Sequence, residues 1–252
     1  MSPILALARG DAGVVVTLFT FRLAGAEIVA DHQGALWWPA QHLLAFADLH
    51  LEKGSSYAVR TTQMLPPYDT RSTLALMGRI ADRYQPKRIV CLGDNFHDPE
   101  GPSRLDAQSR QLIQSLMRGR RFVWIEGNHD AAAAGVLGGE SAPSLRIEGL
   151  VFRHEPEVDS GEGEVSGHLH PVVTVTTRVR RVRRKCFVSD ERRCILPALG
   201  AFTGGLDVFD EAFAPLLRSA FSTYALGRDR IYHFPQQSAG ASQRRLVPGV
   251  GR

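Results

Sequence analysis

The sequence predicts an α/β fold with a two-sheet β-sandwich core flanked by helices. Two observations support this prediction. In the first half, short continuous apolar runs alternate with segments of helical periodicity, as buried strands and their covering helices do. In the second half, strand-like runs follow one another between Gly, Asp, Ser and Glu turns. We therefore expect two sheets packed face to face, with the helices outside.

Strands are expected wherever a short apolar or alternating run is bounded by turn residues. The first expected strand folds back at Gly25, where glycine allows a tight turn. Three of the runs, 42–47, 87–92 and 122–125, end in a continuous apolar stretch, which is typical of buried strands. The expected strands are 17–29, 34–38, 42–47, 87–92, 122–125, 145–153, 164–167, 172–180 and 184–188.

Helices are expected between the buried strands. Apolar residues at helical spacing predict one helix that begins with Asp69 as its N-cap and ends before Pro86. Ser103, followed three residues later by Asp106, resembles a capping box and predicts the start of a second helix. These helices would cover the sheet formed by the buried strands.

Composition favours a cytoplasmic protein with one domain. The chain has 252 residues and a net charge of +4. Cys91, Cys186 and Cys194 form no CxxC pair and no even framework, as expected in a reducing compartment. No apolar stretch is long enough to span a membrane, and the N-terminus has no secretory pattern. We expect a single domain over 1–235 and a disordered tail over 236–252, which is rich in Gly, Ser, Gln and Arg.

Polar residues follow three of the buried strands and recur later in the chain. In open α/β sheets, ligands gather at the carboxyl ends of strands, so we expect these residues to lie together. Asp48 and His50 are two residues apart and would share a face if extended, as would His168 and His170. The polar islands are Asp48-Leu49-His50, Gly93-Asp94-Asn95, Gly127-Asn128-His129-Asp130, His154 and Gly167-His168-Leu169-His170.

The islands supply carboxylate, imidazole and amide ligands without any thiolate. Such a set suits two adjacent divalent metals better than a structural zinc site. A single histidine is more often a surface or core residue than a ligand, and that interpretation applies to His32, His42 and His233, outside the islands. The islands together predict a metal-dependent hydrolase of phosphate esters.

The order of the islands resembles the calcineurin-like metallophosphoesterase superfamily. The segments 48–56, 93–98, 196–200 and 203–206 are also similar to its ligase-associated PdeM type, a DNA damage response endonuclease. The resemblance covers nearly the whole chain except its first dozen residues and its tail. It implies a metallophosphoesterase fold and a phosphodiesterase or nuclease activity.

The resemblance also implies a pair of metal ions bridged by Asp94. Manganese is the first expectation, with iron or zinc as alternatives. A bridging carboxylate lets two cations lie about 3.5–4 Å apart, and a water between them would lose a proton and attack phosphorus. The implied ligands are Asp48, His50, Asp94 and His170 for one metal, and Asp94, Asn128, His154 and His168 for the other.

Further roles follow from the same resemblance. His129 would protonate the leaving group or donate to the phosphate, and Asn128 could also orient the phosphate. Many members place a second aspartate three residues after the bridging one, where it orients the catalytic histidine. Here His97 occupies that position and Asp98 follows, so either could support His129; we favour Asp98.

A basic run follows the last island and suggests a polyanionic substrate. Its cationic residues are Arg178, Arg180, Arg181, Arg183, Arg184 and Lys185. In a hairpin they would present a surface suited to a nucleic-acid backbone. They could equally be a solvated edge strand whose charges discourage aggregation. Few aromatic residues interleave with the arginines, which argues against base stacking there.

Three functions remain open. The first is a DNA endonuclease working beside a DNA ligase and a helicase of a repair system. The second is a small-molecule phosphoesterase acting on nucleotides, cyclic nucleotides or a UDP-linked lipid precursor; the lipid version would need an apolar helical lid, and no such insertion is evident. The third is a non-catalytic repair scaffold, against which the complete ligand set argues. An oligomer is compatible with each of them.

Overall fold

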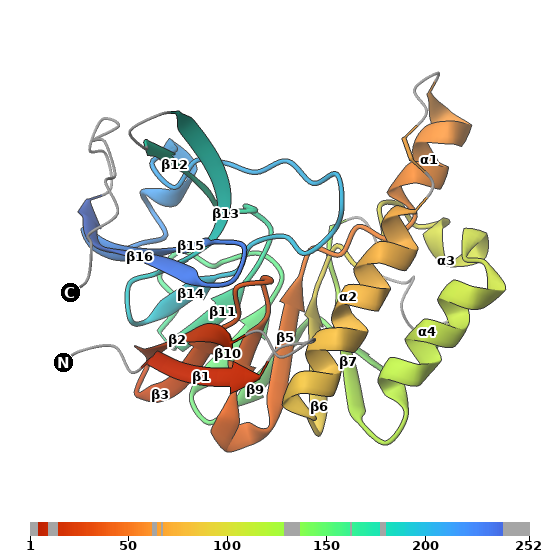
Figure 1. Ribbon diagram of the computed structural model, residues 1–252, viewed down its shortest axis with the longest axis horizontal. Helices are drawn as coiled ribbons and strands as arrows, with labels where there is room; N and C mark the ends of the chain where they lie inside the picture. The colour runs from red at the N-terminus through yellow and green to blue at the C-terminus, as the bar shows by residue number, and fades with distance from the viewer. Residues whose placement is uncertain are drawn as a thin grey trace.

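The computed structural model describes residues 5–9, 15–61, 65–66, 68–128, 137–161, 163–176 and 180–238. Within these ranges the chain forms two β-sheets that pack face to face, with helices against the outer face of the first sheet (Figure 1). The predicted α/β sandwich is therefore confirmed.

The first sheet begins as an antiparallel meander and continues as parallel strands. Neighbours from β1 to β5 pair antiparallel, and those from β5 to β8 pair parallel. The carboxyl ends of β5, β6 and β7 consequently lie at one edge of the sheet. In order across the sheet, the strands are β1 (Leu5–Arg9), β2 (Val15–Leu23), β3 (Ala26–Ala30), β4 (Leu36–Trp38), β5 (Leu43–Ala47), β6 (Arg88–Leu92), β7 (Arg121–Ile125) and β8 (Glu140–Ala142).

The second sheet is mixed and comes from the second half of the chain. Its order is β16-β15-β13-β14-β11-β10-β9, and β12 pairs with β13 off this path. β11 pairs in parallel with both β10 and β14. The strands are β9 (Ser144–Ile147), β10 (Leu150–Arg153), β11 (Gly163–Ser166), β12 (Val172–Thr176), β13 (Arg181–Ser189), β14 (Arg193–Ile195), β15 (Ala220–Leu226) and β16 (Ile231–Ser238).

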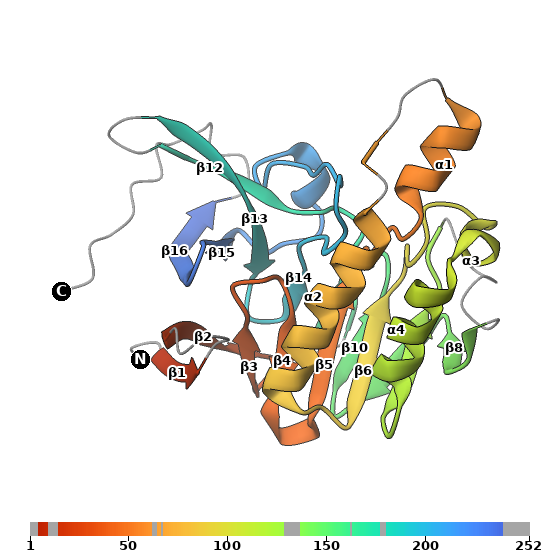
Figure 2. The same cartoon turned by 45° about the vertical axis from the view of Figure 1, so that its right-hand side comes forward.

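The α-helices of the described residues lie on one side of the molecule (Figure 1). α2 (Asp69–Tyr84) and α4 (Ala107–Met117) run side by side across the parallel strands, as Figure 2 shows. α1 (Lys53–Arg60) projects beyond the carboxyl end of β5, and the short α3 (Gly101–Arg104) lies near it (Figure 1).

Alternation along β5 shows how this sheet joins two cores. Leu43 and Ala45 face the second sheet, whereas Leu44 and Phe46 face α2 and α4. All four side chains are fully buried, because successive side chains of a strand point to opposite faces and both faces are covered here. The continuous apolar run of the sequence is explained by this double burial.

Both predicted helix starts were wrong in detail. α2 begins at Asp69 itself, and the Asp69 carboxylate accepts a hydrogen bond from the distant Gly54 N at 2.9 Å instead of capping the helix. The N-cap of α4 is Asp106, whose side chain accepts from Ser109 N at 2.7 Å, while Ser103 lies inside α3. An aspartate carboxylate can accept a hydrogen bond from the first turn of its own helix or from a distant segment. Which of the two donors it finds depends on the surrounding fold.

Two strand predictions also need correction. The expected strand 145–153 is a hairpin, because Glu148 and Gly149 have φ of 47° and 79° and turn the chain between β9 and β10. The expected strand 172–180 ends as β12 at Thr176, and residues 177–179 lie outside the described residues.

At the C-terminus, β16 extends to Ser238. The predicted tail lies outside the described residues from residue 239 on. No helix in the described ranges is long and apolar enough to cross a membrane.

Candidate metal centre

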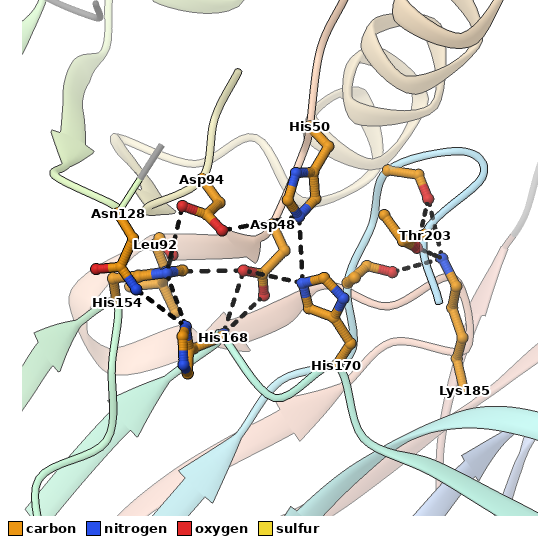
Figure 3. Close-up of polar contacts among 12 residues, drawn as sticks. Asp48, His50, Leu92, Asp94, Asn128, His154, His168, His170, Lys185 and Thr203 are labelled. Atoms are coloured by element: carbon orange, nitrogen blue, oxygen red, sulfur yellow. Dashed lines mark hydrogen bonds and ion pairs between the residues drawn. The ribbon is translucent and has the colours of Figure 1, made fainter. Parts of the chain in front are cut away.

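Strand ends of both sheets deliver the predicted ligands to one place (Figure 3). The first sheet supplies the residues that follow β5, β6 and β7, and the second sheet supplies those that follow β10 and β11. The side chains that converge are Asp48, His50, Asp94, Asn128, His154, His168 and His170. All seven predicted ligands are thus brought together by the fold.

The backbone at these positions is left-handed and not extended as the two-residue spacing suggested. Asp48 and His50 have φ of 51° and 42°, and His168 and His170 have φ of 70° and 48°. Asp94 has φ of 43°. This conformation is strained for most residues, and strain of this kind gathers at functional sites. The side chains therefore converge because the chain turns at each residue, and not because they share a strand face.

Glycines of the islands make room for this packing. A Cβ on Gly127 would lie 2.0 Å from the Asp94 backbone nitrogen, and one on Gly167 would lie 2.5 Å from an Asp48 carboxylate oxygen. Both distances are shorter than any real Cβ contact, so a larger residue would push the carboxylates out of place.

The first group of ligand atoms comprises Asp48, His50 and His170. His50 Nε2 lies 3.3 Å from His170 Nε2, and His170 Nε2 lies 3.3 Å from Asp48 Oδ1. One atom from each residue falls within 4.8 Å of the others, so the three could hold one ion. Asp48 is completely buried and also accepts from His168 N with both oxygens, at 3.2 and 3.1 Å. Its orientation is fixed by this contact.

The second group comprises Asp48, Asp94 and His154, with His168 beside it. His154 Nδ1 lies 3.0 Å from the Leu92 carbonyl oxygen, which can only accept a hydrogen bond. Nδ1 therefore carries the proton, and the lone pair of Nε2 faces Asp94 Oδ1 at 3.4 Å. Burial and the neighbouring His154 lower the pKa of His168, which favours the neutral ring, the form that binds a cation.

The donor set fits divalent cations. Ligands about 2.1 Å from a cation, at angles of 90–109°, lie roughly 3.0–3.4 Å from one another. The separations of 3.2–3.4 Å between His50 and His170, His154 and His168, and His154 and Asp94 match this spacing. Among the described residues, no lysine or arginine forms an ion pair with the buried Asp48. A buried carboxylate needs such compensation, and a bound cation would provide it.

The two groups share Asp48, whereas Asp94 was the expected bridge. Asp94 Oδ2 lies 3.9 Å from His50 Nε2, so its carboxylate does face both groups. Asn128 Nδ2 lies 3.5 Å from His168 Nδ1, on the side of the second group. The bridging role of Asp94 stays a prediction.

The predicted acid, His129, lies outside the described residues, so its support by His97 or Asp98 stays a prediction. Asp98 is buried and accepts from Arg104 Nη2 at 2.7 Å and from Glu100 N at 3.0 Å. Burial alone would raise the pKa of Asp98, but hydrogen bonds from Arg104 and Ser56 lower it well below its ordinary value. These contacts tie Asp98 to α1 and α3. The His97 ring, in contrast, lies 5.9 Å from the His50 ring.

The basic run forms part of the β12–β13 hairpin but does not present one surface. Alternation along β13 places Arg181 and Arg183 on one face and Arg184 on the other. Arg183 donates to the Gly205 carbonyl oxygen, and Arg178 lies outside the described residues. Lys185 differs most from expectation: burial lowers its pKa to about 8, and its ammonium bonds to a loop beside the metal centre. We therefore leave Lys185 out of any nucleic-acid surface.

Two residues near the centre make contacts that the sequence does not predict. Lys53 donates to the Phe202 carbonyl oxygen at 3.0 Å. Tyr57, four residues further on the same face of α1, has its ring 5.6 Å from His97. The four-residue spacing on a helix predicts that Lys53 and Tyr57 lie close together. Nothing in the sequence predicts the contact between Lys53 and Phe202.

The fold and the ligand cluster define a phosphoesterase, and the comparisons identify the family. Residues 42–193 match the family model of the calcineurin-like phosphoesterases. This match spans more than half of the chain, which therefore belongs to the calcineurin-like phosphoesterase family and is a hydrolase acting on phosphate esters. The range includes all seven predicted ligand residues.

A solved nuclease structure shows the same architecture. The crystal structure of Pseudomonas putida nuclease MPE aligns with a TM-score of 0.68 and 28% sequence identity, covering 86% of this chain and 100% of that chain. Yfce, a phosphoesterase from E. coli, aligns with a TM-score of 0.40 and 16% identity, covering 78% of this chain and 98% of that chain. No curated protein gives a significant sequence match.

Proposed function

We propose that this protein is a two-metal phosphodiesterase that cleaves nucleic acid, with DNA as its substrate. The observation that carries the proposal is the convergence of two groups of ligand atoms, within 4.8 Å in each group, at the strand ends of both sheets. The likeness to a nuclease along the whole of that chain supports a nucleic-acid diester over other phosphate esters.

The proposed ligands are Asp48, His50, Asp94, Asn128, His154, His168 and His170, with manganese as the first metal to test and iron or zinc next. Two divalent cations would supply Lewis acidity toward the phosphoryl oxygens and lower the pKa of a coordinated water. The chain's own residues orient these groups: Leu92 fixes the tautomer of His154, and His168 N fixes the Asp48 carboxylate.

Proton transfer and substrate orientation fall to the residues that follow β7. His129 is proposed to protonate the leaving oxygen, and the Asn128 amide can donate to a phosphoryl oxygen. The exposed Asn128 side chain lies at the open side of the cluster, where a substrate would enter. Work beside a DNA ligase and a helicase, as part of DNA repair, stays a prediction.

The test combines a small diester with DNA. We expect manganese-dependent hydrolysis of bis-p-nitrophenyl phosphate and nicking of single- or double-stranded DNA, with both activities lost in Asp94→Ala. Asp229→Ala is the matched control, because this surface carboxylate pairs only with the adjacent Arg230 among the described residues. No diester turnover by the wild type would overturn the proposal, and turnover of small diesters without DNA nicking would favour a small-molecule phosphodiesterase.

A further inference from the structure

The segment 198–206, which we call the clamped loop, borders the metal centre. After β14 it arches from the second sheet toward α1 (Figure 1). Gly200 N donates to the Asp48 carbonyl oxygen at 3.1 Å. A Cβ on Gly205 would lie 2.1 Å from the His170 carbonyl oxygen, so the backbone is in close contact there too. The loop is thus hydrogen-bonded to the backbone of one proposed ligand and packs closely against the backbone of another.

Two ammonium groups from separate elements also hold the loop. Lys53 of α1 donates to the Phe202 carbonyl oxygen at 3.0 Å. Lys185 of β13 donates to three loop oxygens, as Figure 3 shows. They are the carbonyl oxygens of Ala198 at 2.7 Å and Gly200 at 3.0 Å, and the hydroxyl of Thr203 at 2.9 Å. Hydrogen bonds from a charged donor are stronger than neutral ones, so these contacts hold the loop in place.

Phe202 lies in the middle of the clamped loop and has an uncommon backbone conformation. Its φ is 58°, a left-handed conformation that is strained for a bulky residue. The residue is 46% exposed and belongs to none of the buried core clusters. A strained backbone that holds an exposed ring at the edge of a catalytic centre suggests a role in binding.

A row of rings leads from the metal centre to the same place. The His97 ring lies 5.9 Å from the His50 ring and 5.6 Å from the Tyr57 ring. The Lys53 ammonium lies 5.8 Å from the Tyr57 ring centre and bonds to the Phe202 carbonyl. The row therefore connects a proposed ligand with the clamped loop. It supplies the aromatic surface that the basic run lacks.

We propose that Phe202 and Tyr57 form a stacking subsite for the base of the nucleotide that adjoins the reacting phosphate. Lys53 joins the two residues and adds a positive charge beside the path of the backbone. Stacking of a base on an aromatic side chain tolerates any sequence, as a general nuclease requires. The inference rests on the proposed phosphodiesterase function and extends it to the recognition of a base.

The experiment compares two diesters with the same leaving group. Thymidine 5′-(p-nitrophenyl phosphate) carries a base, and methyl p-nitrophenyl phosphate does not. In Phe202→Asn, which removes the ring but suits a left-handed backbone, we expect KM for the thymidine diester to rise about 5- to 140-fold, the range expected for one lost base stack. We expect kcat, and both constants for the methyl diester, to change by less than about twofold, in keeping with a contact that binds only the base.

Controls separate the ring from its surroundings. Phe202→Trp keeps an aromatic surface and should retain the wild-type preference for the thymidine diester. Tyr232→Ala removes a ring of similar exposure, 43%, on β16 and should change neither substrate. Tyr57→Leu should reproduce the selective rise in KM that we expect for Phe202→Asn.

Each other outcome contradicts the subsite. An equal loss on both diesters in Phe202→Asn would mean that the ring only supports the loop, and no change on either would mean that it binds nothing. A wild-type enzyme that turns over neither diester would contradict the phosphodiesterase function itself, and the inference with it. The two failures are distinguished by the wild-type rates alone.

Discussion

The metal centre and the β12–β13 hairpin are both rich in functional side chains, but they are assembled differently. The centre joins residues as distant in sequence as His50 and His170, whose ring nitrogens lie 3.3 Å apart across 120 positions. The hairpin's arginines are close only because they are neighbours in the chain, and they divide between two faces. Distant residues converge only if the whole fold places them. Convergence is therefore the stronger indication of chemistry.

Burial separates the two regions further. Asp48, Asp94 and His154 are each less than 5% exposed, whereas Arg180, Arg181, Arg183 and Arg184 face solvent. Removing one partner of a buried charge is costly, while an exposed arginine interacts with a polyanion through a screened field. Changes in the centre should consequently have large, all-or-none effects, and changes in the hairpin small, graded ones.

The largest expected effect comes from Asp48→Asn. We expect kcat/KM for bis-p-nitrophenyl phosphate to fall by more than about 100-fold, the upper end for residues that merely support a metal ligand. The purified variant should also retain less manganese by elemental analysis. Asp229→Asn serves as the control. Activity near the wild-type level with full metal content would remove Asp48 from the centre.

The next effect tests the packing around the carboxylates. Gly127→Ala should lower activity by roughly 10- to 100-fold, as disturbed support of metal ligands does, because the new Cβ would collide with the Asp94 backbone. Gly78→Ala is the matched control: it lies in α2 with nothing within 4 Å, so it should leave activity intact and stabilise the helix by about 1 kcal/mol. Equal behaviour of the two variants in activity and thermal unfolding would contradict this packing.

Metal removal should be visible in stability as well as in activity. A ligand present at 100 times its Kd stabilises the folded state by about 2.7 kcal/mol, which corresponds to a rise in Tm of roughly 5–10 °C for a chain of this size. We expect this rise when manganese is added to chelator-treated protein in calorimetry. The same addition should shift Asp48→Asn much less. An equal shift in both proteins would place the bound metal elsewhere.

The smallest effect is expected in the hairpin. If Arg180, Arg181, Arg183 and Arg184 contact DNA phosphates, neutralising all four to Gln should reduce the slope of log affinity against log salt by about 0.7–0.9 per contact. The control neutralises Arg79 and Arg118, which are exposed on α2 and at the end of α4. An unchanged slope would leave the hairpin as a solvated edge.

The sequence predicted the strands and the side chains that converge at their ends, but not the backbone conformation that presents these side chains. The apolar runs before Asp48, Asp94 and Asn128 are double-buried strands, so their ends, and the ligands there, could be predicted. The left-handed turns at Asp48 and His50 could not, because the spacing of two residues equally fits a strand.

Residues that contact distant segments were the hardest to predict. The Asp69 carboxylate accepts a hydrogen bond from Gly54 N and does not cap its own helix. The Lys185 ammonium donates to the clamped loop and does not contribute to a basic surface. Each has the residue type expected for the predicted role. The role changed because a partner from another part of the chain lies within hydrogen-bond distance, which only the tertiary structure determines.

The left-handed backbone of the metal centre also affects which substitutions the fold can accept. Asn, Asp and His occur in this conformation far more often than other residues with a Cβ. Asp48, Asp94, His50, His168 and His170 are all of these types, so residues suited to metal binding are also those suited to the turns. Asparagine should therefore replace either aspartate with little harm to folding. A folded, metal-poor protein would then be available for capturing an uncleaved substrate.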